Sequence, residues 1–261
     1  MNRPAGSAPM ETGNPLGWRF PLHRVAFGEA APLLQAAVAP FRVAPLRLTG
    51  LFLLVWIPVL LLAGVQALGP FLSDVGEALA FTAYTGVLDA ASRSELPDFR
   101  HLGVLVRFGR DKLSLLVLSG LVPIVVAVLV LFAVWGLQPT AEFLNALYRP
   151  GGHPSPVMEL DMQAAEDLTG MPFTFVAPVW AVYRWSGSRS MAANLLACCV
   201  NWRWVVAITA FDALAGNLLV WLRGQGDDLA LLSYLGAIAL QMLTLSWTLA
   251  VVQRSFPRSG P

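Results

Sequence analysis

Asp212 and Gln241 stand inside long apolar stretches of this sequence, where polar side chains are rare. An ionisable group inside a bilayer is costly, so it often marks a site of proton or ion chemistry. Helix rise places Asp212, about nine residues beyond Arg203, roughly 13 Å into a membrane. Gln241 lies at a similar depth in the last apolar stretch, and Asn217 follows Asp212. The pattern predicts either a proton or cation site or a hydrogen-bonded Asp212–Gln241 pair that only joins two helices.

Asp74 and Glu77 form a second acidic pair, on adjacent turns near the start of another apolar stretch. They are candidates for the same polar site. The alternative is that they face water or cap a helix N-terminus, where the helix dipole favours carboxylates. Asp89, further along this stretch, is expected to pair with Arg93 four residues later.

Motifs for catalysis or metal binding are absent from the sequence. It contains no His-Glu-x-x-His motif, no P-loop and no Gly-x-Ser-x-Gly elbow. The adjacent Cys198 and Cys199 fit neither a zinc site nor an ordinary disulfide. We therefore expect no enzyme activity, no cofactor and no metal. The net charge of +1 also gives no reason to expect a nucleic-acid partner.

The composition places the chain in a membrane. Its residues are 56% hydrophobic and 13% charged, whereas soluble domains have about 45–50% and about 25%. An all-α polytopic transmembrane bundle is predicted, as a single domain over residues 28–255. Residues 1–27 are expected to form a disordered cytoplasmic tail and residues 256–261 a second cytoplasmic tail. The six predicted spans are residues 46–68, 71–91, 113–135, 168–184, 204–222 and 229–252, with an outer loop over 136–167.

The placement of basic residues predicts the orientation of the spans. All but two of the 17 Arg and Lys residues fall in the tails or in segments on their side, and only Arg149 and Arg223 fall opposite. Basic residues concentrate on the cytoplasmic side of membrane proteins. Both chain ends are therefore expected in the cytoplasm, and the use of Arg over Lys favours a bacterial inner membrane.

Three segments, Pro32–Arg42, Pro97–Gly109 and Ser188–Val200, have the pattern of short amphipathic helices that precede apolar spans. They predict interfacial cytoplasmic helices and a three-fold repeat of helix plus hairpin. Arg100, Arg107 and Arg110 are candidates for contact with anionic lipid, although such helices can also simply anchor loops against the bundle. Glycines within the spans permit close helix packing, and hence homo-oligomers.

One segment carries a resemblance to known proteins. Ala177-Pro178-Val179-Trp180 is followed by Ser190, Ala193, Cys198 and Asn201-Trp202. This arrangement resembles an uncharacterised family of six-span proteobacterial inner-membrane proteins, in which Ala44-Pro45-Leu46 would match an Asn-Pro-Leu block. It also looks like the membrane domain attached to some glycerophosphodiester phosphodiesterases, whose catalytic domain this chain lacks. The resemblance implies a membrane location and no defined activity.

Two functions follow from these features. The first is a non-enzymatic membrane component that works through helix and lipid contacts, for which Asp212 is dispensable. The second is a small transporter or permease with a polar site at Asp212 and Gln241. A cavity that reaches Asp212 would favour the transporter.

Overall fold

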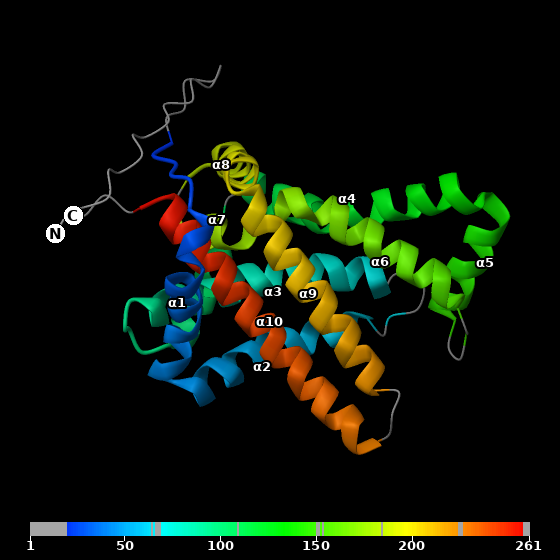
Figure 1. The fold of residues 1–261 in the computed structure, drawn as a ribbon, viewed down its shortest axis with the longest axis horizontal. Helices are drawn as coiled ribbons and strands as arrows, with labels where there is room; N and C mark the ends of the chain where they lie inside the picture. Colours follow the sequence, from blue (N-terminus) through cyan, green and yellow to red (C-terminus); the bar gives the residue numbers. More distant parts are fainter. Residues whose placement is uncertain are drawn as a thin grey trace.

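The computed structural model describes residues 20–63, 65, 69–108, 110–149, 152, 154–183, 185–223 and 227–257, and these residues form helices and no strands. The α-helices are α1 Ala30–Val43, α2 Pro45–Ala63, α3 Gly69–Ser92, α4 Arg110–Trp135, α5 Leu137–Tyr148, α6 Pro156–Gly170, α7 Val176–Val182, α8 Gly187–Val200, α9 Trp202–Arg223 and α10 Asp227–Ser255. Three 3-10 helices lie between them: η1 Phe27–Glu29, η2 Phe99–Arg107 and η3 Met171–Phe173. The predicted all-α class is confirmed, and Figure 1 shows the arrangement.

Several helices have the length and apolar composition that a bilayer requires. Within the described residues, three such segments are Pro45–Leu62, Arg110–Trp135 and Leu231–Ser255. A fourth arises if α8 and the first part of α9, bent by 88° at their junction, count as one broken span. Large apolar side chains such as Leu61, Leu129 and Leu231 stay exposed along these helices, as expected of side chains that face lipid. The chain is thus a membrane protein by the composition of its helices.

The described parts of the two chain ends lie against each other at one end of the bundle (Figure 1). His23 N–H donates to the Ser255 carbonyl, and Asn201 joins both ends by accepting from Val25 N–H and donating to Ser255 Oγ. Phe20, Leu22 and Val25 are buried in the main core. Residues 20–25 are therefore packed, where the sequence predicted a disordered tail, because this segment has three apolar side chains to bury. The preceding residues of that tail, 1–19, lie outside the described residues.

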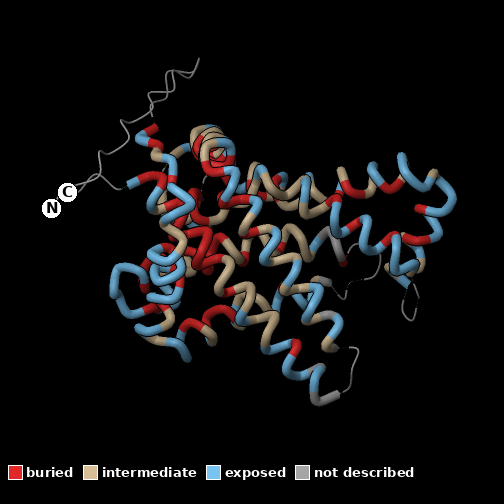
Figure 2. The backbone as a smooth tube through the Cα atoms, viewed as in Figure 1, coloured by how far each residue is buried: buried red, intermediate tan, exposed pale blue. Residues whose placement is uncertain are grey.

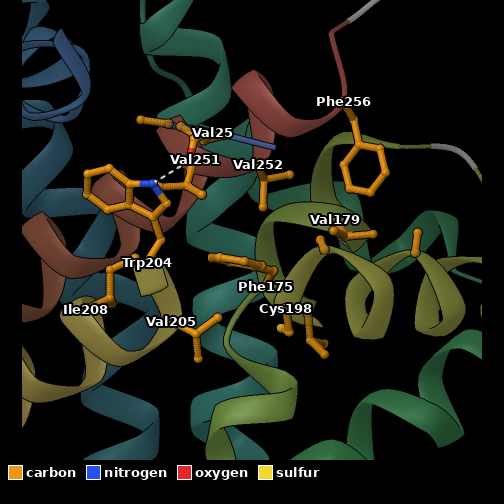
Figure 3. Close-up of a cluster of buried hydrophobic side chains, with 14 of the residues drawn as sticks. Val25, Phe175, Val179, Cys198, Trp204, Val205, Ile208, Val251, Val252 and Phe256 are labelled. Atoms are coloured by element: carbon orange, nitrogen blue, oxygen red, sulfur yellow. Dashed lines mark hydrogen bonds between the residues drawn. The ribbon is translucent and has the colours of Figure 1, made fainter. Parts of the chain in front are cut away.

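The main core lies where the chain ends meet α7, α8, α9 and α10. Figure 3 shows Phe175, Val205, Ile208 and Val252 gathered there, with the hydrogen bond from Trp204 Nε1 to the Val25 carbonyl. Figure 2 shows that buried residues concentrate in this part of the bundle, while α5 and the far ends of α9 and α10 are largely exposed.

The segment 136–167, predicted as an outer loop, is helical and forms α5 and most of α6. Its position on the outer side of the membrane stays a prediction. Met158, Met162 and Ala165 repeat at helical spacing on α6 and pack against Ala127 and Leu131 of α4. This apolar stripe explains why a segment rich in acidic residues folds as a helix.

The predicted span over 168–184 is not a continuous helix. α6 ends at Gly170, η3 follows, and α7 covers only Val176–Val182. Pro172 and Pro178 account for the breaks, since proline cannot donate a helical hydrogen bond. The second predicted span is the continuous helix α3, whose acidic residues make it less apolar than the three spans above.

All three predicted amphipathic segments contain a helix. The first is α1, which buries Leu33 and Ala37 against the bundle and accepts a hydrogen bond from Ser246 at the Ala37 carbonyl. The second is the 3-10 helix η2 and the third is α8. The three-fold repeat stays a prediction, since one of the three segments is a different kind of helix.

Candidate functional site

A cavity of about 360 Å³ lies between α3, α4, the broken segment α6–η3–α7, α9 and α10. Five carboxylate side chains from three helices line it, and we call it the acidic cavity. They are Asp74 and Glu77 of α3, Glu166 and Asp167 of α6, and Asp212 of α9. Its hydroxyl groups come from residues such as Ser119, Thr244 and Thr248, and no Arg, Lys or His of the described ranges lines it. The volume lies in the range of sites that hold small solutes.

The five carboxylates are close enough to repel one another. Glu77 is repelled by Asp74, Asp212 and Glu166, and Asp167 is repelled by Asp212. None of them forms an ion pair within the part of the chain that the structure describes. Among the described residues, Thr244 Oγ1 donates a hydrogen bond of 3.0 Å to the Asp212 carboxylate at Oδ1. Half-buried carboxylates without a base need a proton or a cation to balance them.

The backbone around the cavity also favours positive charge. Glu166 and Asp167 occupy the last turn of α6, where the helix dipole disfavours carboxylates and attracts cations. Pro123 lies inside α4 and has no N–H for the carbonyl four residues earlier, that of the cavity residue Ser119. A helix carbonyl without its N–H partner is a suitable acceptor for a cation or a protonated group.

Close helix packing at Gly120 holds α3 and α4 together beside the carboxylates. A Cβ atom at Gly120 would lie 2.9 Å from the Asp74 carbonyl oxygen, a distance that no side chain tolerates without movement of the backbone. The glycine therefore lets α4 approach α3 at the position of the acidic pair.

The main core closes one side of the acidic cavity. Leu116, Val176 and Ile208 belong to that core and also line the cavity. On α9, Trp204, Ile208 and Asp212 follow at intervals of four residues, and Trp204 is bonded to the N-terminal segment at Val25. These core residues form an apolar layer between the carboxylates and the end of the bundle where the chain ends lie.

The structure brings together only some of the predicted site residues. Asp74, Glu77 and Asp212 share the cavity, whereas Gln241 and Asn217 do not line it. Asp212 accepts from Thr244 in place of the predicted Gln241, whose Oε1 is buried without a partner. Asn217 is exposed and donates to the Ala213 carbonyl of its own helix. The predicted Asp89–Arg93 pair is confirmed at 3.4 Å.

Sequence reasoning missed Glu166 and Asp167, because it placed them in the outer loop. The helical spacing of Met158, Met162 and Ala165 was the available signal. It predicts a helix that runs up to the acidic pair, and a loop of this length without secondary structure is uncommon.

No three His, Cys, Asp or Glu side chains among the described residues are placed to hold one metal ion. Comparison of the chain with family models, with curated proteins and with solved structures finds no match.

Proposed function

We propose that this protein is a small non-enzymatic membrane transporter whose acidic cavity binds a cation. One observation carries the proposal: five carboxylates from three helices line one cavity, and no basic side chain lines it. Buried charge of one sign is not retained for stability, because it costs folding free energy unless a counter-charge enters. Protons, a monovalent cation or a small organic amine would supply that charge.

The path of the chain supports a proposed topology of six crossings. α2, α3, α4, α9 and α10 would each cross the bilayer, and the broken segment α6–η3–α7 would make the remaining crossing. This segment begins beside the far part of α4 and ends near the chain ends, where Tyr183 donates to the Phe256 carbonyl. We place the protein in a bacterial inner membrane with both ends in the cytoplasm. Reporter fusions within α5 test this orientation, since a cytoplasmic signal there would contradict it.

Flux measurements on purified protein in vesicles test the transport proposal. The probes are protons, followed by a pH-sensitive dye inside the vesicle, then Tl⁺ and labelled methylammonium. Wild-type vesicles should take up at least one of them faster than protein-free vesicles. Asp212→Asn and Glu166→Gln should each reduce that uptake by about tenfold, the effect of losing one interaction of about 1.4 kcal/mol.

Glu159→Gln is the matched control, because Glu159 lies on α6 but is exposed and outside the cavity. Its uptake should equal that of the wild type. Uptake of all three probes at the rate of empty vesicles would reject the transporter. The first alternative, a membrane component that acts through helix and lipid contacts, would then take its place.

A further inference from the structure

A second cavity, of about 730 Å³, lies at the opposite side of the apolar layer, near the chain ends. We call it the basic cavity, because three basic side chains line it: Arg93, Arg107 and Lys112. Two carboxylates line it as well. Asp89 pairs with Arg93, and Asp111 accepts a hydrogen bond from Gly187 N–H at the start of α8. Neither Arg107 nor Lys112 forms an ion pair with a carboxylate among the described residues.

Lys112 is the decisive residue, because it is buried and forms no ion pair among the described residues. The residue is 7% exposed. Its Nζ donates to the Tyr183 carbonyl at 3.3 Å and lies 4.7 Å from the centre of the Phe108 ring. The neighbouring Asp111 attracts its charge from beyond ion-pair distance, and this carboxylate also accepts the hydrogen bond from Gly187 N–H. A buried ammonium group with so distant a counter-charge favours a further anion beside it.

Trp180 adds an unused donor to the same cavity. It is 1% exposed, lines the basic cavity, and its buried indole Nε1–H has no acceptor among the described residues. Buried indole N–H groups usually have a partner. An anion in the cavity would supply a counter-charge to Lys112 and a hydrogen-bond acceptor to Trp180.

We propose that the basic cavity binds a phosphate group, through Lys112, Trp180 and Arg107. Phosphate offers several acceptor oxygens to an ammonium, a guanidinium and an indole at once. The neighbouring surface points to a membrane lipid as the source. Val106, the neighbour of Arg107 in the sequence, is 88% exposed, and Phe99 at the other end of η2 is 66% exposed, so this short helix presents apolar side chains where acyl chains would lie.

Of the three arginines predicted to contact anionic lipid, this proposal uses only Arg107. Arg107 lines the cavity, whereas Arg100 and Arg110 do not. Arg100 is exposed and lies 3.9 Å from Asp98. It provides a matched control, being a basic residue on the same short helix and outside the cavity.

Native mass spectrometry of the purified protein in detergent tests the proposal with short-chain phosphatidylglycerol and short-chain phosphatidylcholine. The anionic lipid should bind more tightly, because its headgroup carries no cation of its own to compete for the phosphate. Lys112→Gln should weaken that binding about tenfold, as expected for the loss of one charge-assisted hydrogen bond. Trp180→Phe, which removes only the donor, should weaken it about threefold. Arg100→Gln should leave it unchanged.

Competition by inorganic phosphate and glycerol phosphate shows whether the bound phosphate group belongs to a lipid or to a free ion. Displacement of the lipid at equal concentration would identify a site for free phosphate, and failure to displace it would identify a lipid site. Both outcomes support a phosphate site. Equal binding of the two lipids, or equal effects of Lys112→Gln and Arg100→Gln, would overturn it.

Chemical labelling of the wild type provides a test that needs no variant. Lys112 is the single lysine of the chain, so acetylation of a lysine side chain reports on this cavity alone. Phosphatidylglycerol should slow that acetylation and phosphatidylcholine should not. Equal rates with the two lipids would contradict the proposal even if Lys112→Gln fails to fold.

Discussion

Replacing Glu77 by Gln should make the protein more stable. The side chains have the same shape, so packing in the acidic cavity is kept while one charge is removed. Glu77 is the carboxylate that faces most of the others, being repelled by Asp74, Asp212 and Glu166. If the cavity holds uncompensated charge, its removal relieves repulsion from three neighbours. If Glu77 stabilised the fold, its replacement by Gln would lower the stability of the protein.

The size of the effect follows from the spacing on α3. Side chains three residues apart on a helix lie about 5–6 Å apart, and two unit charges at about 6 Å repel by about 3 kcal/mol at an effective dielectric constant of about 20. Water in the cavity and rotation of the side chains reduce this value, so we expect a gain of roughly 1–3 kcal/mol. For a domain of this size that corresponds to a rise in melting temperature of roughly 3–10 °C.

Thermal unfolding in detergent, followed by tryptophan fluorescence, measures this shift. It should be large at pH 8 and should shrink at pH 5, because protonation of the carboxyl groups removes the repulsion in the wild type as well. Glu159→Gln, on the exposed face of α6, should stay within about 0.5 kcal/mol of the wild type at both values. A Glu77→Gln variant that melts at or below the wild-type temperature at pH 8 would refute the idea that the cavity carries net negative charge.

Two further predictions concern the packing that supports the cavity. Asn201→Ala should destabilise the protein by about 1–3 kcal/mol, because the buried Val25 N–H loses its acceptor, while the Ser255 hydroxyl loses the bond it accepts and still donates to the Val251 carbonyl; unfolding temperature measures this, and an unchanged value would contradict it. Gly120→Ala should cost about 1–3 kcal/mol, since its Cβ would meet the Asp74 backbone. Gly216→Ala, where a Cβ meets nothing within 4 Å, should be neutral or stabilising, and equal effects of the two glycine variants would show that α3 and α4 are not closely packed.

The sequence was informative where one physical property dominates. The uninterrupted apolar runs predicted α2, α4 and α10, because only a helix of that length satisfies its backbone in lipid. It was misleading over 136–167, where the acidic residues were taken as a sign of solvent and the apolar stripe of Met158 and Met162 was overlooked. Pro172 and Pro178 indicated that the span over 168–184 is irregular, but a hydropathy pattern does not show where its helix breaks.

The sequence predicted individual residues of the acidic cavity, but it did not predict that they line one cavity. Asp74, Glu77 and Asp212 were each singled out by the cost of a charge within an apolar stretch. Their convergence depends on how α3, α6 and α9 pack, which no local pattern encodes. Gln241 shows the reverse case, because its depth in the sequence matched that of Asp212 while its side chain lies outside the cavity.

Along the bundle, the basic cavity, the apolar layer and the acidic cavity follow one another. In a transporter, this layer would control the passage of a cation between the acidic cavity and the end of the bundle where the chain ends lie. On α4, Lys112 lines the basic cavity, Leu116 belongs to the core and Ser119 lines the acidic cavity. Helix rise separates the first from the last by about 10 Å, so the layer is only about two helical turns thick. A packed core changes by discrete rearrangement rather than by gradual deformation. Pro123 on α4 and the breaks around η3 border the acidic cavity, and such interruptions are where helices bend. The elements that would have to move to open the layer are therefore those in which the helical hydrogen bonds are already broken.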